Sequence, residues 1–144
     1  MSYLIDTCVI SELRKKIPPH VANWFESKDE ELFFISVVTI AELLDGIERL
    51  PTSKKKRNLE DWLHGDLLSR FKDRILSIDE KVAKTWGLLS AGLKNKGINV
   101  GIQDLYIAAT ARVNSLAVVT LNLKDFKDTD IPIFNPWSYT GVEG

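Results

Sequence analysis

The amino-acid sequence predicts an α/β fold, in which a three-layer α/β/α sandwich surrounds a central parallel sheet of four to five strands. Short apolar segments alternate along the chain with longer segments of helical periodicity, as they do in folds built on parallel strands. The apolar segments are hydrophobic at consecutive positions, which is typical of strands covered by helices on both faces. The 144 residues contain no internal repeat or linker-like stretch, so a single domain over residues 1–144 is expected.

The first half of the chain supplies two predicted strands and three predicted helices. Residues 2–5 form an apolar strand, and the helix after it is expected to end before Pro18-Pro19. A second helix begins at these prolines, because proline suits a first helical turn. Residues 32–35 are predicted to form the second strand, and Ser36 is expected to cap the third helix, which ends before Pro51.

The second half of the chain is expected to complete the sheet. In chain order, the predicted elements are a charged amphipathic helix over 53–71, a strand over 74–78, a helix from 79 to 96, a helix over 102–113, a strand over 116–121 and a strand over 131–134. Asp79 is the expected cap of the long helix, and Gly97 is expected to end it. Pro132 marks the last strand as an edge strand, because proline cannot donate a hydrogen bond to a neighbouring strand.

Charge and cysteine content exclude several classes of protein. Nineteen Lys and Arg against twenty Asp and Glu give a net charge of −1, which excludes a strongly basic nucleic-acid-binding module. A single cysteine, Cys8, excludes a disulfide-stapled scaffold. The N-terminus lacks signal-peptide features, and no apolar stretch approaches the roughly 20 residues that cross a bilayer. We therefore expect a cytoplasmic protein that does not associate with membranes.

Acidic side chains occupy four positions that the predicted topology brings to one edge of the sheet. Asp6 follows the first strand, Glu42 lies in the helix after the second strand, and Asp104 lies on the apolar face of helix 102–113. Asn122 and Asp125 compete for the fourth position, after the fourth strand. Each position also has an ordinary interpretation, as a helix cap, a surface acid, a first-turn acid or a polar turn.

Convergence of these carboxylates indicates a metal site. Carboxyl ends of parallel strands form sites at the edge of the sheet, where three or four carboxylates would repel one another. A cation removes this conflict, and a donor set of oxygen atoms favours Mg²⁺ or Mn²⁺ over Zn²⁺. Carboxylate-bound Mg²⁺ performs phosphodiester hydrolysis by activating a water and stabilising the developing charge.

Five ordered segments resemble a PIN-domain ribonuclease, and most of all the VapC-type toxins of toxin–antitoxin pairs. The segments are LIDTCVISEL, TIAELLDGI, QDLYIAATA, VVTLNLKDF and IFNPW. This resemblance covers nearly the whole chain. It implies an α/β/α sandwich, Mg²⁺-dependent cleavage of RNA, a homodimer, and inhibition by a small cognate antitoxin that places a basic side chain on the carboxylates.

The resemblance also assigns roles to the acidic residues. Asp6, Glu42 and Asp104 match the three acids of the family. By this match, Asp6 and Asp104 are the principal metal ligands, and Glu42 binds the metal directly or through a water. These three residues form the core of the predicted catalytic site.

The fourth acidic position departs from the family pattern. A fourth acid often stands two residues after the threonine matched by Thr120, and this chain has Asn122 there. Asn122 is the positional match and could hold a metal-bound water, whereas Asp125 could supply the charge from three residues further on. Cys8 is a second departure, because asparagine is frequent at that position. Thr7 and Thr120 offer hydroxyl groups that could orient a ligand or a water.

Two further expectations concern RNA. Arg112, Lys124 and Lys127 lie near the acidic edge in sequence and are candidate contacts to RNA phosphates, which position a substrate without selecting its sequence. The alternative to an enzyme is a PIN-like module that has lost catalysis and binds RNA or a protein partner. Asn122 favours this alternative, and the retention of three acids argues against it.

Overall fold

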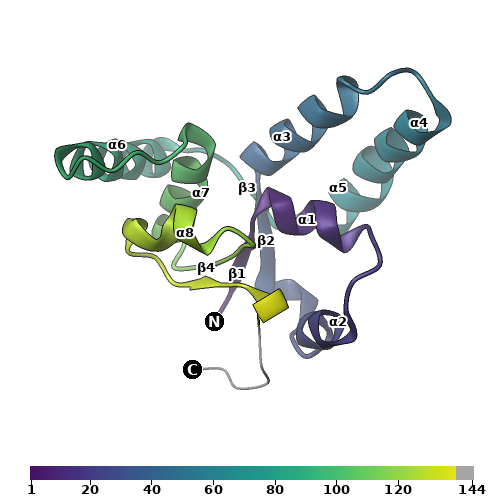
Figure 1. Cartoon of the computed structure of the whole chain (residues 1–144), viewed down its shortest axis with the longest axis horizontal. Helices are drawn as coiled ribbons and strands as arrows, with labels where there is room; N and C mark the ends of the chain where they lie inside the picture. The colour runs from purple at the N-terminus through teal and green to yellow at the C-terminus, as the bar shows by residue number, and fades with distance from the viewer. Residues whose placement is uncertain (139–144) are drawn as a thin grey trace.

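A five-stranded parallel sheet forms the centre of the computed structural model, which describes residues 1–138 (Figure 1). The strand order is β3-β2-β1-β4-β5, and every neighbouring pair is parallel. The strands are β1 (Tyr3–Ile5), β2 (Phe33–Ser36), β3 (Ile75–Leu76), β4 (Ala117–Val119) and β5 (Ile133–Phe134). Five strands agree with the predicted four to five.

Helices cover both faces of the sheet, which confirms the predicted α/β/α sandwich. Helices α1, α2, α4 and α5 lie on one side of the strands, and α6, α7 and α8 lie on the other (Figure 1). None of the helices within residues 1–138 has the length and hydrophobicity needed to span a membrane. The helix bounds are α1 (Thr7–Leu13), α2 (Pro19–Glu26), α3 (Val37–Glu48), α4 (Lys54–Asp61), α5 (Leu68–Arg70), α6 (Glu80–Asn95), α7 (Ile102–Val113) and α8 (Leu123–Phe126).

The alternation of side chains along each strand divides the interior into two hydrophobic cores. Tyr3 and Ile5 of β1 pack in the core beneath α1, α2, α3 and α4, whereas Leu4 packs in the core beneath α7 and α8. Ala117 and Val119 of β4 face the first core, and Val118 faces the second. This division follows because successive strand residues point to opposite faces of the sheet.

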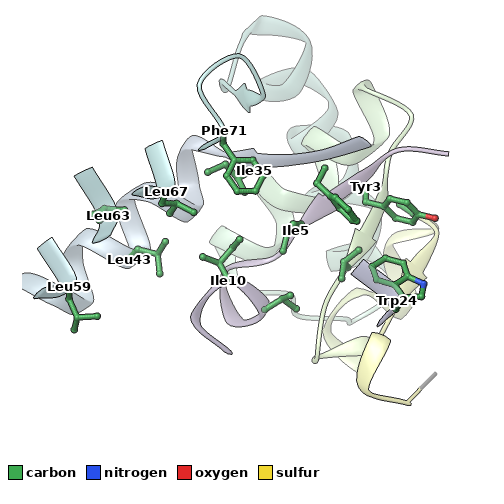
Figure 2. Packing of buried hydrophobic residues seen from close by; sticks show 14 of the residues in the cluster. Tyr3, Ile5, Ile10, Trp24, Ile35, Leu43, Leu59, Leu63, Leu67 and Phe71 are labelled. Carbon is green, nitrogen blue, oxygen red and sulfur yellow. The ribbon is translucent and has the colours of Figure 1, made fainter. Parts of the chain in front are cut away.

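The segment predicted as one amphipathic helix over 53–71 is helical but contains a wider turn. A π-helical segment, Trp62–Leu67, joins α4 to α5. Buried apolar side chains recur at every fourth position, at Leu59, Leu63, Leu67 and Phe71. With 3.6 residues per turn, a spacing of four rotates each successive side chain about 40° out of line. The wider π turn offsets this rotation, and Figure 2 shows Leu59, Leu63 and Leu67 in a row beside Leu43 of α3.

The predicted helix caps are present, whereas four of the five strands are shorter than predicted. Ser36 Oγ accepts a hydrogen bond from Val38 N at 3.0 Å, and Asp79 Oδ1 accepts one from Val82 N at 2.9 Å. Gly97 has a φ of +73° just after α6, the left-handed conformation that favours glycine at a helix end. Strand β1 starts one residue later than predicted, β3 has two residues, β4 has three and β5 has two. Arg74 O and Thr120 N still hydrogen-bond to the neighbouring strands, at Ile35 N (3.1 Å) and Phe134 O (2.9 Å). Sequence periodicity did not predict α8, which is only four residues long.

Truncation of Leu63 tests the role of this helical segment. Leu63 is fully buried, so Leu63→Ala should lower the free energy of unfolding by about 2–5 kcal/mol. The neighbouring exposed residue provides the control, and His64→Ala should change stability by less than about 0.5 kcal/mol. Urea unfolding measures both values, and equal effects of the two variants would contradict the packing described here.

Candidate active site

The candidate site lies where the chain reverses direction across the sheet. From β1 the chain proceeds through β2 to β3, and it then crosses to β4 on the other side of β1. In open parallel sheets, ligands bind beyond the carboxyl ends of the strands at such a switch point. Asp6 directly follows β1 and Thr120 directly follows β4, so both residues lie at this point.

Asp6 is buried, and both of its carboxylate oxygens are hydrogen-bonded. Oδ1 accepts a hydrogen bond from Thr7 N at 2.9 Å, which makes Asp6 the cap of α1. Oδ2 accepts from the Thr120 hydroxyl at 2.8 Å and from the Cys8 thiol at 3.3 Å. The capping role expected for an acid at this position is therefore confirmed, and the same carboxylate is also fixed within the candidate site.

Thr120 connects the ends of β1 and β4 through its hydroxyl group. The hydroxyl is fully buried, donates its proton to Asp6 and accepts a hydrogen bond from Asn122 N at 3.0 Å. In this arrangement the Thr120 hydroxyl orients a carboxylate of the protein.

Glu42 is hydrogen-bonded to Thr7 on α1, and Thr7 in turn contacts Thr39 on α3. Thr7 Oγ1 lies 2.8 Å from Glu42 Oε1 and 3.0 Å from Thr39 Oγ1. An ionised carboxylate can only accept, so Thr7 donates to Glu42 and accepts from Thr39. Sequence reasoning missed Thr39, which is fully buried. Its position three residues before Glu42, on the same face of the helix, was the signal that could have identified it.

The pKa of the Glu42 carboxyl is raised, mainly by burial. The negative charge of Asp6 adds to this rise, and the hydrogen bond from Thr7 opposes it. Glu42 is therefore close enough to Asp6 for the two charges to interact.

Asp104 occupies the first turn of α7, at the edge of an apolar helix face. Ile107, Ala108 and Ala111 of that face are fully buried, as the sequence predicts, and Asp104 itself is half-buried. Burial raises the pKa of the Asp104 carboxyl to about 6, with further contributions from the charges of Asp6, Asp125 and Glu42 in that order. The four carboxylates therefore form one electrostatic site, although they come from different elements of the fold.

The two candidates for the fourth position lie on either side of the start of α8, and both are exposed. Asn122 precedes the first residue of α8, and its side chain makes no capping hydrogen bond. Asp125 contributes to the raised pKa of Asp104, so its charge is felt within the site. This electrostatic coupling supports Asp125 as a contributor of charge.

The remaining polar candidates take different positions. Arg112 Nη2 donates to the backbone oxygens of Thr129 at 2.8 Å and Asp130 at 3.5 Å, so its guanidinium braces the loop after α8. Lys124 and Lys127 are exposed at α8 and just after it. Contact of these three residues with RNA stays a prediction.

Cys8 supports the site as a neutral thiol. Burial, followed by the charge of Asp6, raises the Cys8 pKa to about 11. The thiol therefore keeps its proton near neutral pH and can donate it to Asp6. This state excludes a thiolate nucleophile, because only the deprotonated sulfur is strongly nucleophilic.

Comparison with known proteins identifies the family. A family model of the PIN domain matches residues 3–132. The chain belongs to the PIN domain family. It is 39% identical over 135 residues to toxin FitB of Neisseria gonorrhoeae, and the aligned region covers 93% of this chain and 97% of FitB. It is 33% identical over 135 residues to VapC ribonuclease Y4jK of Sinorhizobium fredii, and the aligned region covers 93% of this chain and 96% of that protein.

Solved structures agree with this assignment. The crystal structure of FitAcB from Neisseria gonorrhoeae matches this PIN domain with a TM-score of 0.88 at 38% identity, covering 95% of this chain and 99% of that chain. A toxin–antitoxin complex from Klebsiella pneumoniae matches with a TM-score of 0.71 at 26% identity, covering 96% and 100%. The predicted fold and the resemblance to PIN-domain toxins are both confirmed.

The donor set of this PIN domain fits a divalent cation in chemistry and charge. PIN-domain ribonucleases generally depend on a divalent metal. Asp6, Glu42 and Asp104 offer only oxygen atoms, which suit a hard ion. Burial is the main cause of the raised pKa values of Glu42 and Asp104, and neighbouring negative charges, which a cation would neutralise, add to both. Within residues 1–138, no group of three or more His, Cys, Asp or Glu side chains is placed closely enough to hold a metal ion. The assignment of ligands therefore stays a prediction.

The raised pKa of Asp104 predicts how stability depends on pH in metal-free buffer. The folded-state pKa of about 6 exceeds the ordinary value of 3.8, so the folded protein binds more protons than the unfolded chain between these values. The free energy of unfolding should therefore fall as pH rises from about 4 to about 6. Asp104→Asn should remove this part of the slope, as measured by urea unfolding in EDTA.

An exposed acid provides the control for this measurement. Asp45→Asn changes a carboxylate on α3 that pairs with Arg49 at 3.0 Å, and it should keep the wild-type dependence between pH 4 and 6. Parallel stability curves for Asp104→Asn and the wild type across this range would show that Asp104 is not perturbed.

Proposed function

We propose that this PIN-domain protein is a metal-dependent endoribonuclease, a hydrolase of RNA phosphodiester bonds, that acts as the toxin of a toxin–antitoxin pair. The observation that carries the proposal is the placement of Asp6, Glu42 and Asp104 at the carboxyl edge of the sheet, where burial and then the charges of Asp6, Asp125 and Glu42 raise the pKa of Asp104. Relatives named as a toxin and as a ribonuclease over nearly their full lengths support the same function. Cytoplasmic localisation, which fits an RNA substrate, is part of the proposal.

The residues of the site divide into ligands and supporting groups. Asp6 and Asp104 would bind the cation, and Glu42 would bind it directly or through a water. Asn122 and Asp125 would line the solvent-facing side of this cation site. A bound Mg²⁺ or Mn²⁺ supplies an activated water and neutralises charge that develops on the phosphate and the leaving oxygen.

The supporting groups hold the carboxylates in fixed orientations. Thr120 and Cys8 donate hydrogen bonds to Asp6, and Thr7 donates to Glu42. Such partners around metal ligands maintain their orientation, and their removal typically costs 10–100-fold in metal affinity or activity. Lys124 and Lys127 are exposed near Asp125 in sequence, and in this proposal they contact RNA phosphates beside the site.

A catalytically weakened module that binds RNA or a protein partner is the alternative, and Asn122 in place of the fourth acid favours it. The hydrogen bonds around Asp6 and Glu42 favour the enzyme. A pure binding surface gains nothing from a half-buried carboxyl such as Asp104, whose charged form is disfavoured.

The proposed partners are a cognate antitoxin and a second copy of the chain. A cavity of about 480 Å³ lies among α1, α2 and the helical segment 62–71, and its mainly apolar lining suits side chains of an antitoxin.

On the other side of the sheet, Leu88 and Ile102 are 78% and 63% exposed, which suits a homodimer contact at α6 and α7. Light scattering on the chain alone and after coexpression with an antitoxin measures both assemblies.

Removal of the metal or of its ligands should abolish RNA cleavage. Purified protein free of antitoxin should cleave members of a tRNA and mRNA panel in Mg²⁺ or Mn²⁺ and not in EDTA. Asp6→Asn, Glu42→Gln and Asp104→Asn should each reduce the cleavage rate by about 100-fold or more, because loss of supporting partners alone costs 10–100-fold. Gel analysis of the RNA products measures these rates.

The exposed acid on α3 again supplies the control, and Asp45→Asn should cleave at the wild-type rate. Equal cleavage in EDTA would refute the metal-dependent mechanism. RNA binding without cleavage under every metal condition would favour the binding-module alternative instead.

A further inference from the structure

A groove of about 210 Å³ leads away from the candidate site between α1, α3 and Trp62. At the site it begins with Thr7 and Glu42, and it continues past Ser11 of α1 and Arg14, the residue that directly follows α1 as its C-cap. Thr7, Ser11 and Arg14 are spaced by four and three residues, so they lie along one face of the helix. The groove therefore connects the candidate catalytic carboxylates with a positive charge on the same helix.

Arg14 is the only cation among the described residues that line this groove. Its guanidinium lies 5.0 Å from the centroid of the Trp62 ring, in a cation–π contact. Within residues 1–138, Arg14 has no salt bridge, and the neighbouring acid Glu12 pairs with Lys15 at 3.2 Å instead. This contact restrains the exposed Arg14 side chain and leaves its N–H groups available for an anion.

We propose that this groove holds the RNA strand on one side of the scissile phosphate, and that Arg14 binds a backbone phosphate there. The inference rests on the proposed nuclease function and adds a positioning residue and a substrate path to it. Ser11, between Thr7 and Arg14, offers a hydroxyl to the same strand.

Electrostatics explains why such a contact is needed. The acidic site repels phosphates, so a substrate requires compensating positive charge outside the site. Seven residues of helix separate Thr7 from Arg14 by about 10 Å, which corresponds to about three nucleotides at ~3.4 Å rise per nucleotide in a stacked strand. Arg14 is therefore far enough from the carboxylates to keep its charge unpaired, and close enough to hold the same strand.

Gly46 provides a second, independent position in the groove. It lies on α3 one turn after Glu42, and a Cβ atom added there would meet no other atom within 4 Å. A substitution at Gly46 therefore places a side chain in the groove without displacing a neighbour. It should also leave the helix at least as stable, because glycine is unfavourable in a helix interior.

The first test measures the salt dependence of RNA binding. The probe is a labelled single-stranded RNA of about 12 nucleotides, which suits a groove-sized site, and EDTA prevents cleavage. Arg14→Gln should lower affinity by about fivefold at ~0.1 M salt and reduce the slope of log K against log salt by about 0.7, the value for one lost phosphate contact. Lys15→Gln removes one positive charge from the residue next to Arg14, outside the groove lining, and should keep the wild-type slope.

The second test changes charge at Gly46 with matched side chains. Gly46→Glu and Gly46→Gln add side chains of nearly equal size, and only the first adds negative charge. Binding of the same RNA should be weaker for Gly46→Glu than for Gly46→Gln by a factor that shrinks as salt rises. This pair tests the groove even if Arg14→Gln fails to fold.

The outcomes separate this inference from the proposed function. One outcome would refute the groove and leave the nuclease function standing. In it, the wild type cleaves RNA, Arg14→Gln keeps the wild-type salt slope, and Gly46→Glu binds RNA as tightly as Gly46→Gln does. If Arg14→Gln weakens only the complex with antitoxin, Arg14 serves the protein partner and the inference is wrong. If the wild type neither binds nor cleaves RNA, the proposed function itself fails.

Discussion

The hydrogen bond from the Thr120 hydroxyl to the Asp6 carboxylate connects the two strand ends on which the candidate site depends. At 2.8 Å and fully buried on the Thr120 side, it joins the carboxyl ends of β1 and β4 where the sheet reverses its winding. Asp6 N also donates to Val119 O at 2.9 Å, so backbone and side chain fix the same junction. The sheet register thereby determines where the first acid of the site lies, and α3 and α7 bring the others to it.

Charge is the unfavourable part of this arrangement. Burial and mutual repulsion raise the pKa values of Glu42 and Asp104, so the metal-free site stores negative charge that the fold alone does not neutralise. The net charge of −1 conceals this distribution. With Asp6, Glu42, Asp104 and Asp125 assigned to the site, sixteen acids remain against nineteen bases, and the rest of the chain carries +3. A mildly basic body around an acidic site suits an enzyme that must hold RNA and a cation together.

Hydrophobic periodicity, and the rule that sites form at the carboxyl ends of parallel strands, predict much of the fold and of the candidate site from sequence. The buried strands, the caps Ser36 and Asp79 and the apolar face behind Asp104 all follow from local patterns that the tertiary structure preserves. Contacts between distant segments were not predictable in this way. Thr39 resembles an ordinary helix residue until the fold places it beside Thr7, which lies 32 residues earlier in the chain. The π turn at Trp62–Leu67 arises from packing of side chains spaced by four, which helix propensity does not encode.

The central claim is that Asp104 belongs to a shared carboxylate site that a divalent cation neutralises. Calorimetric titration of the protein with Mn²⁺, in buffers of different ionisation enthalpy, measures proton release directly. With the Asp104 pKa at about 6, binding at pH 6 should release about half a proton, and binding at pH 8 should release almost none. Equal proton release at both pH values, or no Mn²⁺ binding at either, would contradict the account.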